Sequence, residues 1–205
     1  MEILKPHFVI EDEVDGEQIL KNLERYGRTC YKSEDKITPD SARKFVATIL
    51  KSGHESVIEH EKVTVRVICD RGITHEIVRH RIASYSQEST RYCNYRSRGV
   101  QVIKPFFFVG DDKKYQIWLN AMRACEEAYN ALIEAGATPQ EARSVLPNSL
   151  KTEIIITYNL REWRHFFKLR CSKRAHPQMR EITLPLLREF QRLIPILFDD
   201  ISEKE

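Results

Sequence analysis

Apolar residues recur at helical spacing in several stretches of the chain. These stripes predict helices over residues 19–26, 38–53, 112–135, 138–147, 159–169 and 184–198. Gly27 and Gly53 are expected to end the first two helices, and Pro185 and Pro195 to kink or break the last. Helices therefore make up most of the predicted regular structure.

Side chains that can cap a helix N-terminus support several of these starts. Thr38 precedes Pro39 in the first turn of the second helix. The run Thr138-Pro139-Gln140-Glu141 combines a cap, a first-turn proline and a glutamate three residues after the cap. Asn159 is expected to cap the next helix, with Glu162 at the reciprocal position.

A second pattern, with a period of two residues, predicts strands. It is clearest from Glu61 to Cys69, and shorter runs follow at Val100–Ile103 and Thr152–Tyr158. After the first strand we expect a turn at Asp70-Arg71-Gly72 and then a short helix that Thr74 caps. Long helices with few, separated strands favour an α+β fold. We expect a small central sheet, mostly antiparallel or mixed, flanked by long helices.

Length and composition limit the classes of protein to which this chain can belong. The 205 residues, 41% of them hydrophobic and 31% charged, suffice for one sizeable core, and no linker or repeat divides them. A single domain over residues 1–205 is therefore predicted. The mean hydropathy is -0.47, and the N-terminus lacks the basic start and apolar stretch of a signal peptide. A cytoplasmic protein without a membrane contact is expected.

Cysteines and histidines give no support for a metal site. The five cysteines are scattered without a C-x-x-C pair, so reduced thiols are expected rather than disulfides or a cysteine zinc site. His54, Glu59 and His60 are spaced H-x-x-x-x-E-H, which fits neither common zinc-protease pattern. We predict no bound metal.

The positions of the charged residues are more informative than the net charge. The net charge is only +3, because 33 basic residues meet 30 acidic ones. From Arg79 to Arg98, however, His80 and a set of arginines stand against the single carboxylate of Glu88. The arginines are Arg79, Arg81, Arg91, Arg96 and Arg98.

This basic stretch has the side chains of a nucleotide site. Guanidinium groups match phosphate oxygens, hydroxyls such as those of Ser89 and Thr90 add donors, and Gln87 offers an amide for a base edge. No G-x-G-x-x-G or phosphate-binding lysine loop is present, so arginines would have to bind any phosphate. Two alternatives remain open: a solvated basic face, and a module that binds RNA or single-stranded DNA.

Four separated segments narrow these possibilities. They are Gly53-His54-Glu55-Ser56-Val57-Ile58-Glu59-His60, Arg79-His80-Arg81 followed after seven intervening residues by Ser89, Ala142-Arg143-Ser144-Val145-Leu146-Pro147, and residues 159–170. In this order they resemble the G-H-x-S-x-x-E-H, R-H-R and A-R-x-x-L-P segments and the arginine-bearing helix of the flavin-dependent thymidylate synthases. The resemblance extends over most of the chain, and a nucleic-acid module does not account for the last two segments.

The resemblance implies reductive methylation of dUMP to dTMP. In that family 5,10-methylenetetrahydrofolate supplies the carbon, and FAD reduced by NADPH supplies the hydride. It also implies a homotetramer whose active sites are shared between subunits, with no nucleic-acid partner.

Residue matching carries the family's ligands onto this chain. The implied dUMP ligands are Glu76, Arg79, Gln87, Ser89, Thr90, Arg91, Arg143 and Arg170. The implied FAD ligands are His54, Ser56, Arg79, His80, Arg81, Gln87, Asn159, Arg161 and His165. Many relatives have Asn-Glu where this chain has Ser86-Gln87, and some have Asn at the position of His165.

The resemblance makes Arg170 the implied catalytic residue. Classical thymidylate synthases activate uracil with a cysteine that normally follows a proline, and no Pro-Cys pair occurs here. A cation that favours the N3-deprotonated ring would instead raise the electron density at C5. Arg170 matches the family position for that role.

Overall fold

The structure is a computed structural model that describes residues 1–97, 99–108 and 112–202. Arg98, part of the basic stretch, lies outside the described residues. The chain divides into two compact units, each gathered from separate segments. Unit 1 contains Met1–His7, Val67–Arg79 and the described part of Tyr85–Ile155, and unit 2 contains Phe8–Arg66, His80–Ser84 and residues 156–202. One domain over residues 1–205 stays a prediction.

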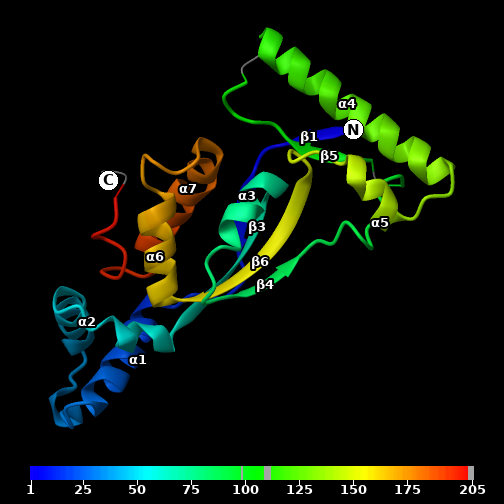
Figure 1. Cartoon of the computed structure of the whole chain (residues 1–205). Coiled ribbons are helices and arrows are strands. Elements are labelled where there is room, and N and C mark those ends of the chain that lie inside the picture. Colours follow the sequence, from blue (N-terminus) through cyan, green and yellow to red (C-terminus); the bar gives the residue numbers. More distant parts are fainter. Residues whose placement is uncertain (98, 109–111, 203–205) are drawn as a thin grey trace. The chain divides into compact units, whose positions relative to one another are not determined.

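Unit 1 packs a long helix on short strands. Strands β1 (Glu2–Leu4) and β5 (Gln101–Ile103) pair in parallel, with Glu2 opposite Gln101. Helix α4 (Lys113–Glu134) lies beside this pair (Figure 1), and α5 (Pro139–Ala142) follows it. The core between them is apolar and contains Tyr95, Val100, Val102, Trp118, Leu119, Met122, Tyr129, Ala142 and Leu150. Helix α3 (Arg71–Ile77) completes the unit.

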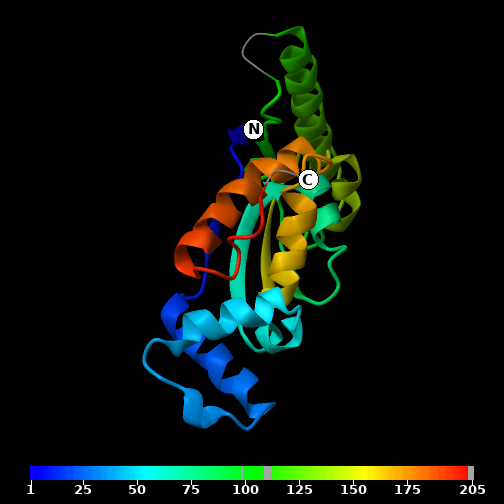
Figure 2. The ribbon, with the colours of Figure 1, turned by 90° about the vertical axis from the view of Figure 1, so that its left-hand side faces the viewer.

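Unit 2 is built mainly from helices. Helix α1 (Gly16–Thr29) packs on α2 (Ser41–Lys51), and a 3-10 segment at Glu55–His60 contacts both α1 and α6 (Leu160–Arg170). Helix α7 (Pro177–Leu193) lies against α6 in both ribbon views (Figure 2).

An aromatic cluster fills the core of unit 2. Trp163 and Phe167 stack with ring centroids 5.5 Å apart, and Phe190 of α7 lies 4.9 Å from Trp163. The indole Nε1 of Trp163 donates to the backbone oxygen of Val63 at 2.9 Å, so this buried ring has its polar atom satisfied. The cluster fixes α6, the helix that carries the predicted flavin residues Arg161 and His165.

Four strands form the larger sheet, in the order β2-β3-β6-β4. They are β2 (His7–Ile10), β3 (Lys62–Asp70), β6 (Lys151–Asn159) and β4 (Ser84–Gln87). The α+β class and the small sheets agree with the sequence prediction, although the described residues form two sheets rather than one central sheet. No helix in the described part of the chain has the length and apolar character needed to cross a membrane.

Local starts and stops differ from the sequence prediction at several points. Helix α3 begins directly after β3 without the predicted turn, because the Asp70 carboxylate, not Thr74, caps it by accepting from the Ile73 amide at 2.9 Å. Helix α1 continues past Gly27 to Thr29. Strand β4, inside the basic stretch, was not predicted.

A close backbone contact in unit 2 gives the first testable prediction. A Cβ at Gly16 would lie 2.0 Å from the backbone oxygen of Leu193, which flexible side-chain motion cannot relieve. We expect Gly16→Ala to lower the free energy of unfolding by about 1–3 kcal/mol in a denaturant titration. Lys21→Ala, on the exposed face of the same helix, should change it by no more than about 0.5 kcal/mol. Equal stability of the two variants would contradict this packing.

Candidate functional site

His80 is one of the predicted flavin residues in unit 2, and it lies beside another, His165. The ring of His80 is buried, with 5% of the residue exposed. Nδ1 lies 2.9 Å from Oε1 of Glu162, and Nε2 lies 3.2 Å from Nε of Arg170. His165 and Phe166 pack edge-on against the ring at 5.4 and 5.0 Å. His80 therefore joins the first and last turns of α6.

These contacts define the protonation state of His80. The Nε of Arg170 is always a donor, so Nε2 of His80 must accept and the proton must lie on Nδ1, which donates to Glu162. Burial lowers the pKa of His80 below its ordinary value of 6.5, and the charges of Arg170 and His165 lower it further. Glu162 raises the pKa but does not reverse the shift. His80 is thus a neutral ring with a fixed tautomer.

Local sequence explains why α6 presents these groups. Asn159 caps the helix, as predicted, by accepting from the Glu162 amide at 2.8 Å. The Glu162 side chain does not complete the reciprocal cap interaction but instead binds His80. Arg170 is the last residue of the helix, half-buried, and its backbone oxygen accepts from the Thr183 hydroxyl at 2.9 Å. Both ends of α6 are therefore held.

Two cavities in unit 2 bring other predicted flavin residues together. One, of about 440 Å³, is lined by Asn159, Arg161 and His165 together with Glu55 and Glu59. The other, of about 360 Å³, is lined by His54, Ser56 and again Arg161. Two of the four sequence segments, residues 53–60 and 159–170, thus meet in one unit.

The guanidinium of Arg161 is paired with carboxylates. It bonds Glu59 through Nη1 and lies 3.6 Å from Glu55 through Nε. The hydrogen bond to Glu59 raises the pKa of Arg161. Its charge is already balanced, so these cavities suit a planar, hydrogen-bonding group better than a phosphate.

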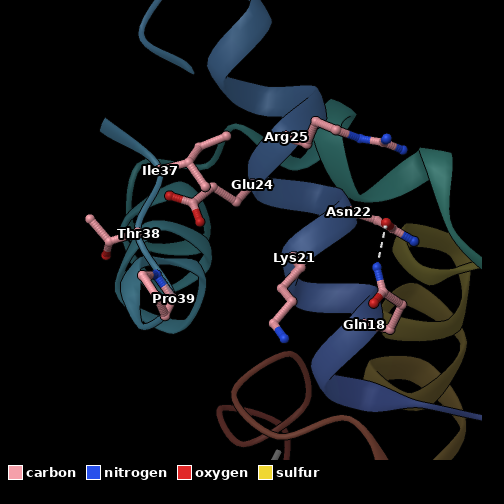
Figure 3. Close-up of a pocket in the computed structure, with 8 residues that line it drawn as sticks. All are labelled: Gln18, Lys21, Asn22, Glu24, Arg25, Ile37, Thr38 and Pro39. Carbon is pink, nitrogen blue, oxygen red and sulfur yellow. Dashed lines mark hydrogen bonds between the residues drawn. The ribbon is translucent and has the colours of Figure 1, made fainter. Parts of the chain in front are cut away.

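A third cavity, of about 460 Å³, lies between α1 and residues 37–39 (Figure 3). No residue of the predicted site lines it. Its Glu24 carboxylate is occupied by Arg28 at 2.7 Å and by the Ser41 hydroxyl. In the close-up Arg25 extends away from the space that Lys21 faces. The cavity has no convergent set of polar groups.

The predicted dUMP residues other than Arg170 belong to unit 1. Nη1 of Arg143 reaches the Thr90 hydroxyl at 3.4 Å, and the Ser89 hydroxyl accepts from the Arg91 amide at 3.3 Å. This places residues of two separate sequence segments, the R-H-R segment and the A-R-x-x-L-P segment, side by side. Arg79, Arg91 and Arg143 are exposed and Glu76 is half-buried.

Gln87 is held within unit 1 by two hydroxyl groups. Its Nε2 donates to Thr74 at 3.0 Å and to Thr152 at 3.3 Å. The side-chain orientation is therefore set by α3 and β6. Predicted contacts of Gln87 with either ligand stay predictions.

The predicted site residues divide between the two units. His54, Ser56, His80, Arg81, Asn159, Arg161, His165 and Arg170 belong to unit 2. Arg79, Gln87 and the remaining dUMP residues belong to unit 1. The chain passes from one unit to the other between Arg79 and His80, inside the R-H-R segment.

Sequence reasoning missed two side chains that support the site. Glu162 looked like a capping residue, and no local signal pointed to His80, 82 positions earlier. Arg164 is buried and forms a two-pronged contact with Asp200 at 2.6 and 2.7 Å, which holds the pKa of that carboxyl below its ordinary value. The helical stripe alone could have indicated that Arg164 faces inward, beside Trp163 and Phe167.

A network around Glu88 supports the basic stretch in unit 1. Its carboxylate accepts from the hydroxyl of Tyr95 at 3.1 Å and from Nζ of Lys151 at 3.2 Å. Its amide donates to the backbone oxygen of Glu153 at 2.9 Å, next to β4. The lone carboxylate of the stretch is therefore a structural anchor for the loop that carries Ser89, Thr90 and Arg91.

Among the described residues, one group has the spacing of metal ligands. Ligand atoms of His80, Glu162 and His165 all lie within 4.8 Å of one another. Both ring nitrogens of His80 already have hydrogen-bond partners, and one partner is a cation. A divalent ion would have to displace the contact with Glu162 beside the Arg170 charge, so this group fits hydrogen bonding better than metal binding.

Comparison with known proteins assigns the family. The family model for thymidylate synthase complementing protein matches residues 14–196. The chain belongs to the flavin-dependent thymidylate synthases. A relative of that name from Geobacter sulfurreducens is 39% identical over 180 residues, which are 84% of this chain and 78% of the relative. One from Pyrococcus furiosus is 36% identical over 82% of this chain and 70% of its own length. The chain is thus an enzyme of this type.

Solved structures share the fold. The UMP/dUMP methylase PolB of Streptomyces cacaoi, bound with 5-Br dUMP, matches 97% of this chain and 96% of its own with a TM-score of 0.82 and 23% identity. Thymidylate synthase X of Helicobacter pylori, solved with FAD and dUMP, matches 95% of this chain and 99% of its own with a TM-score of 0.75 and 21% identity. The chain therefore has the same fold as these two proteins.

The burial of neutral His80 predicts a pH-dependent stability. Because its pKa is lower in the folded chain, its stabilising contribution is complete above pH 6.5 and is lost as the pH falls from 6.5 towards the folded pKa. In that window the loss from one proton is at most about 1.4 kcal/mol per pH unit. Denaturant titrations from pH 7.5 to 5 should show this slope in the wild type, and His80→Gln should remove it.

The control for this prediction is His75→Gln. His75 is exposed on α3 in unit 1, so its replacement should leave the wild-type slope unchanged. A His80→Gln variant with the full wild-type slope below pH 6.5 would show that His80 is not the group that gains the proton.

Proposed function

We propose that this chain methylates dUMP reductively to dTMP, with 5,10-methylenetetrahydrofolate as carbon donor, FAD as cofactor and NADPH as reductant. The observation that carries the proposal is the family match over residues 14–196. The Helicobacter pylori structure with FAD and dUMP and the PolB structure with 5-Br dUMP add support for these two ligands. In the overall reaction the methylene carbon bonds to C5 of uracil, the C5 proton leaves, and a hydride completes the methyl group.

The residues of unit 2 have the chemistry that a flavin requires. His54, Ser56, Asn159 and His165 offer aromatic faces, a hydroxyl and an amide around the two cavities that Arg161 joins. When bound, the cofactor would supply the hydride. Because Glu55 and Glu59 balance Arg161, the exposed guanidinium groups of Arg79 and Arg81 are better suited to hold its pyrophosphate.

The dUMP residues of unit 1 suit a phosphate. Arg143 and Arg91 are exposed guanidinium groups beside the hydroxyls of Thr90 and Ser89. Charged forks with neutral donors beside them can bind several phosphate oxygens at once. We propose that this group binds the phosphate of dUMP.

Arg170 is the residue we propose to activate the uracil ring. Its guanidinium is a permanent cation and donates to His80, whose burial keeps that ring neutral. Placed beside the ring, it would favour loss of the N3 proton and raise the electron density at C5. This role needs no bond between the protein and C6.

The proposed oligomeric state and cellular location also rest on the family resemblance. We propose a homotetramer with active sites shared between subunits, and a cytoplasmic enzyme that uses no nucleic-acid or membrane partner. The alternative of an RNA- or single-strand-binding module loses support, because the matched region includes segments that it does not require.

The proposed reaction predicts dTMP formation from dUMP, 5,10-methylenetetrahydrofolate, FAD and NADPH together. Omission of dUMP, 5,10-methylenetetrahydrofolate or NADPH, or removal of bound FAD, should abolish it, as followed by chromatographic detection of dTMP. Arg170→Ala should lower kcat by about 100-fold or more because the ring-activating charge is lost. Arg170→Lys, which keeps a charge without the guanidinium geometry, should retain measurable turnover.

Arg174→Ala is the matched control for Arg170. Arg174 is an exposed arginine one turn further along the chain, and its loss should leave kcat within twofold. FAD binding, read from the flavin absorbance of the purified variants, should persist in Arg170→Ala. An Arg170→Ala variant that forms dTMP at the wild-type rate would remove Arg170 from the mechanism.

The cysteines give a separate prediction. All five are free thiols, and burial raises the pKa of Cys69 far above its ordinary range. Chemistry that relies on Arg170 needs none of them as a nucleophile. Each single cysteine-to-alanine variant should therefore form dTMP with kcat within about threefold of the wild type once its folding has been checked by circular dichroism. One inactive but folded variant that still binds FAD would contradict this.

A further inference from the structure

We propose that Glu162 is a positioning residue for Arg170 and acts through the ring of His80. The inference rests on the proposed role of Arg170 in uracil activation. Neither Glu162 nor this relay was among the predicted site residues.

The geometry is a chain of two hydrogen bonds across one imidazole. Oε1 of Glu162 lies 2.9 Å from Nδ1 of His80, and Nε2 of His80 lies 3.2 Å from Nε of Arg170. Each bond constrains the other, because an imidazole with one proton can accept at Nε2 only if Nδ1 carries that proton. A carboxylate has no proton to offer and can only accept, so Glu162 selects the tautomer that Arg170 needs.

The placement of the two residues on α6 explains why an intermediary is required. Glu162 is in the first turn and Arg170 is the last residue, so their backbones are separated by a rise of about 12 Å. The side chain of a helical residue leans back towards the helix N-terminus, which brings the Arg170 guanidinium towards the ring. His80 comes from a different segment of unit 2 and joins the two ends.

Burial protects the hydrogen bond between Glu162 and His80 from competition with water. His80 is 5% exposed and Glu162 is 7% exposed, so water has little access to either partner. Hydrogen bonds in such surroundings are stronger than on the surface, and their loss is more costly. The ring is also fixed laterally by Phe166 at 5.0 Å and Tyr158 at 6.1 Å. Loss of the Glu162 charge would release the tautomer while leaving the ring in place.

The consequence should appear in catalysis more than in binding. With Glu162→Gln, the amide can donate to Nδ1 of His80 as well as accept from it, so the proton is no longer held on Nδ1. Whenever the proton lies on Nε2, Arg170 loses the acceptor that His80 provides. We expect kcat to fall by roughly tenfold to a hundredfold, with KM for dUMP changed less than threefold.

A plain structural role for Glu162 predicts something different. An acidic residue in the first turn of a helix stabilises it by interaction with the helix dipole. Its loss would lower stability without a link to Arg170. Glu24→Gln is the matched control, because Glu24 is another buried glutamate of unit 2, bonded to Arg28 and Ser41 on α1. Glu24→Gln should reduce stability but leave kcat within twofold.

A double-mutant cycle tests whether Glu162 acts through Arg170. In the Arg170→Lys background, Glu162→Gln should lower kcat by less than threefold, because the orientation it maintains is already lost. Its effect in the wild-type background should be much larger. Equal fold-changes in the two backgrounds would overturn the positioning role.

The pH profile gives a second catalytic readout. The groups that face His80 are Glu162, His165 and Arg170 of α6 and Tyr158 of β6. Protonation of His80 removes the acceptor for Arg170, so kcat should fall on the acid side of the pH profile. Because Glu162 raises the pKa of His80, Glu162→Gln should move this acid limb to lower pH. An unmoved or upward-shifted limb would count against the relay.

The tautomer itself can be measured without turnover. Nitrogen-15 NMR of histidine-labelled protein should show His80 protonated at Nδ1 and bare at Nε2, with this pattern lost in Glu162→Gln. A proton on Nε2 in an active wild type would overturn the inference alone. A wild type with the expected tautomer that forms no dTMP would instead overturn the proposed function, and with it the catalytic role of the relay.

Discussion

A buried imidazole has two polar atoms that must both be satisfied, and this requirement organises the site. His80 meets it by donating to Glu162 and accepting from Arg170. Both partners belong to α6, so the ring can be satisfied only when that helix is formed along its whole length. The tautomer of His80 therefore depends on this pair of hydrogen bonds, whereas its neutral charge follows mainly from burial.

The arginines of unit 2 illustrate how surroundings assign different tasks to one residue type. Arg164 is buried and paired with Asp200, so it holds the segment after α7 to α6. Arg161 lies at the surface, and its charge is balanced by Glu55 and Glu59 at the mouths of two cavities. Arg170 donates to a neutral imidazole from the end of α6. It is the one of these three arginines that we propose to stabilise the ring anion.

The sequence predicted what local chemistry determines. The Asn159 cap, the capping box at Thr138 and the strand before Asp70 follow from neighbours within a few residues, and the structure confirms them. The R-H-R segment also indicated a functional site before any contact was known. What the sequence could not give are contacts between distant segments.

Glu162 shows the limit most clearly. Its position after Asn159 satisfied the capping pattern, yet its side chain turns to a ring 82 residues earlier, where the buried histidine is a strong hydrogen-bond donor. The cap of α3 failed for the converse reason. Thr74 had the right chemistry, but the Asp70 carboxylate stood one turn earlier and could accept from the Ile73 amide.

The reaction we propose, which uses no covalent thiol, places a particular demand on this scaffold. A cysteine bonded to the substrate ring would fix the distance between protein and substrate by the bond itself, whereas a charge acts at whatever distance the fold sets. The position of Arg170 must therefore come from packing. Trp163, Phe166 and Phe167 bury one face of α6 in the aromatic core, while Glu162 and Arg170 hold His80 from the same helix. The aromatic core and the residue we propose to activate the ring thus share a single helix, so we expect a change in the packing of α6 to alter the position of Arg170.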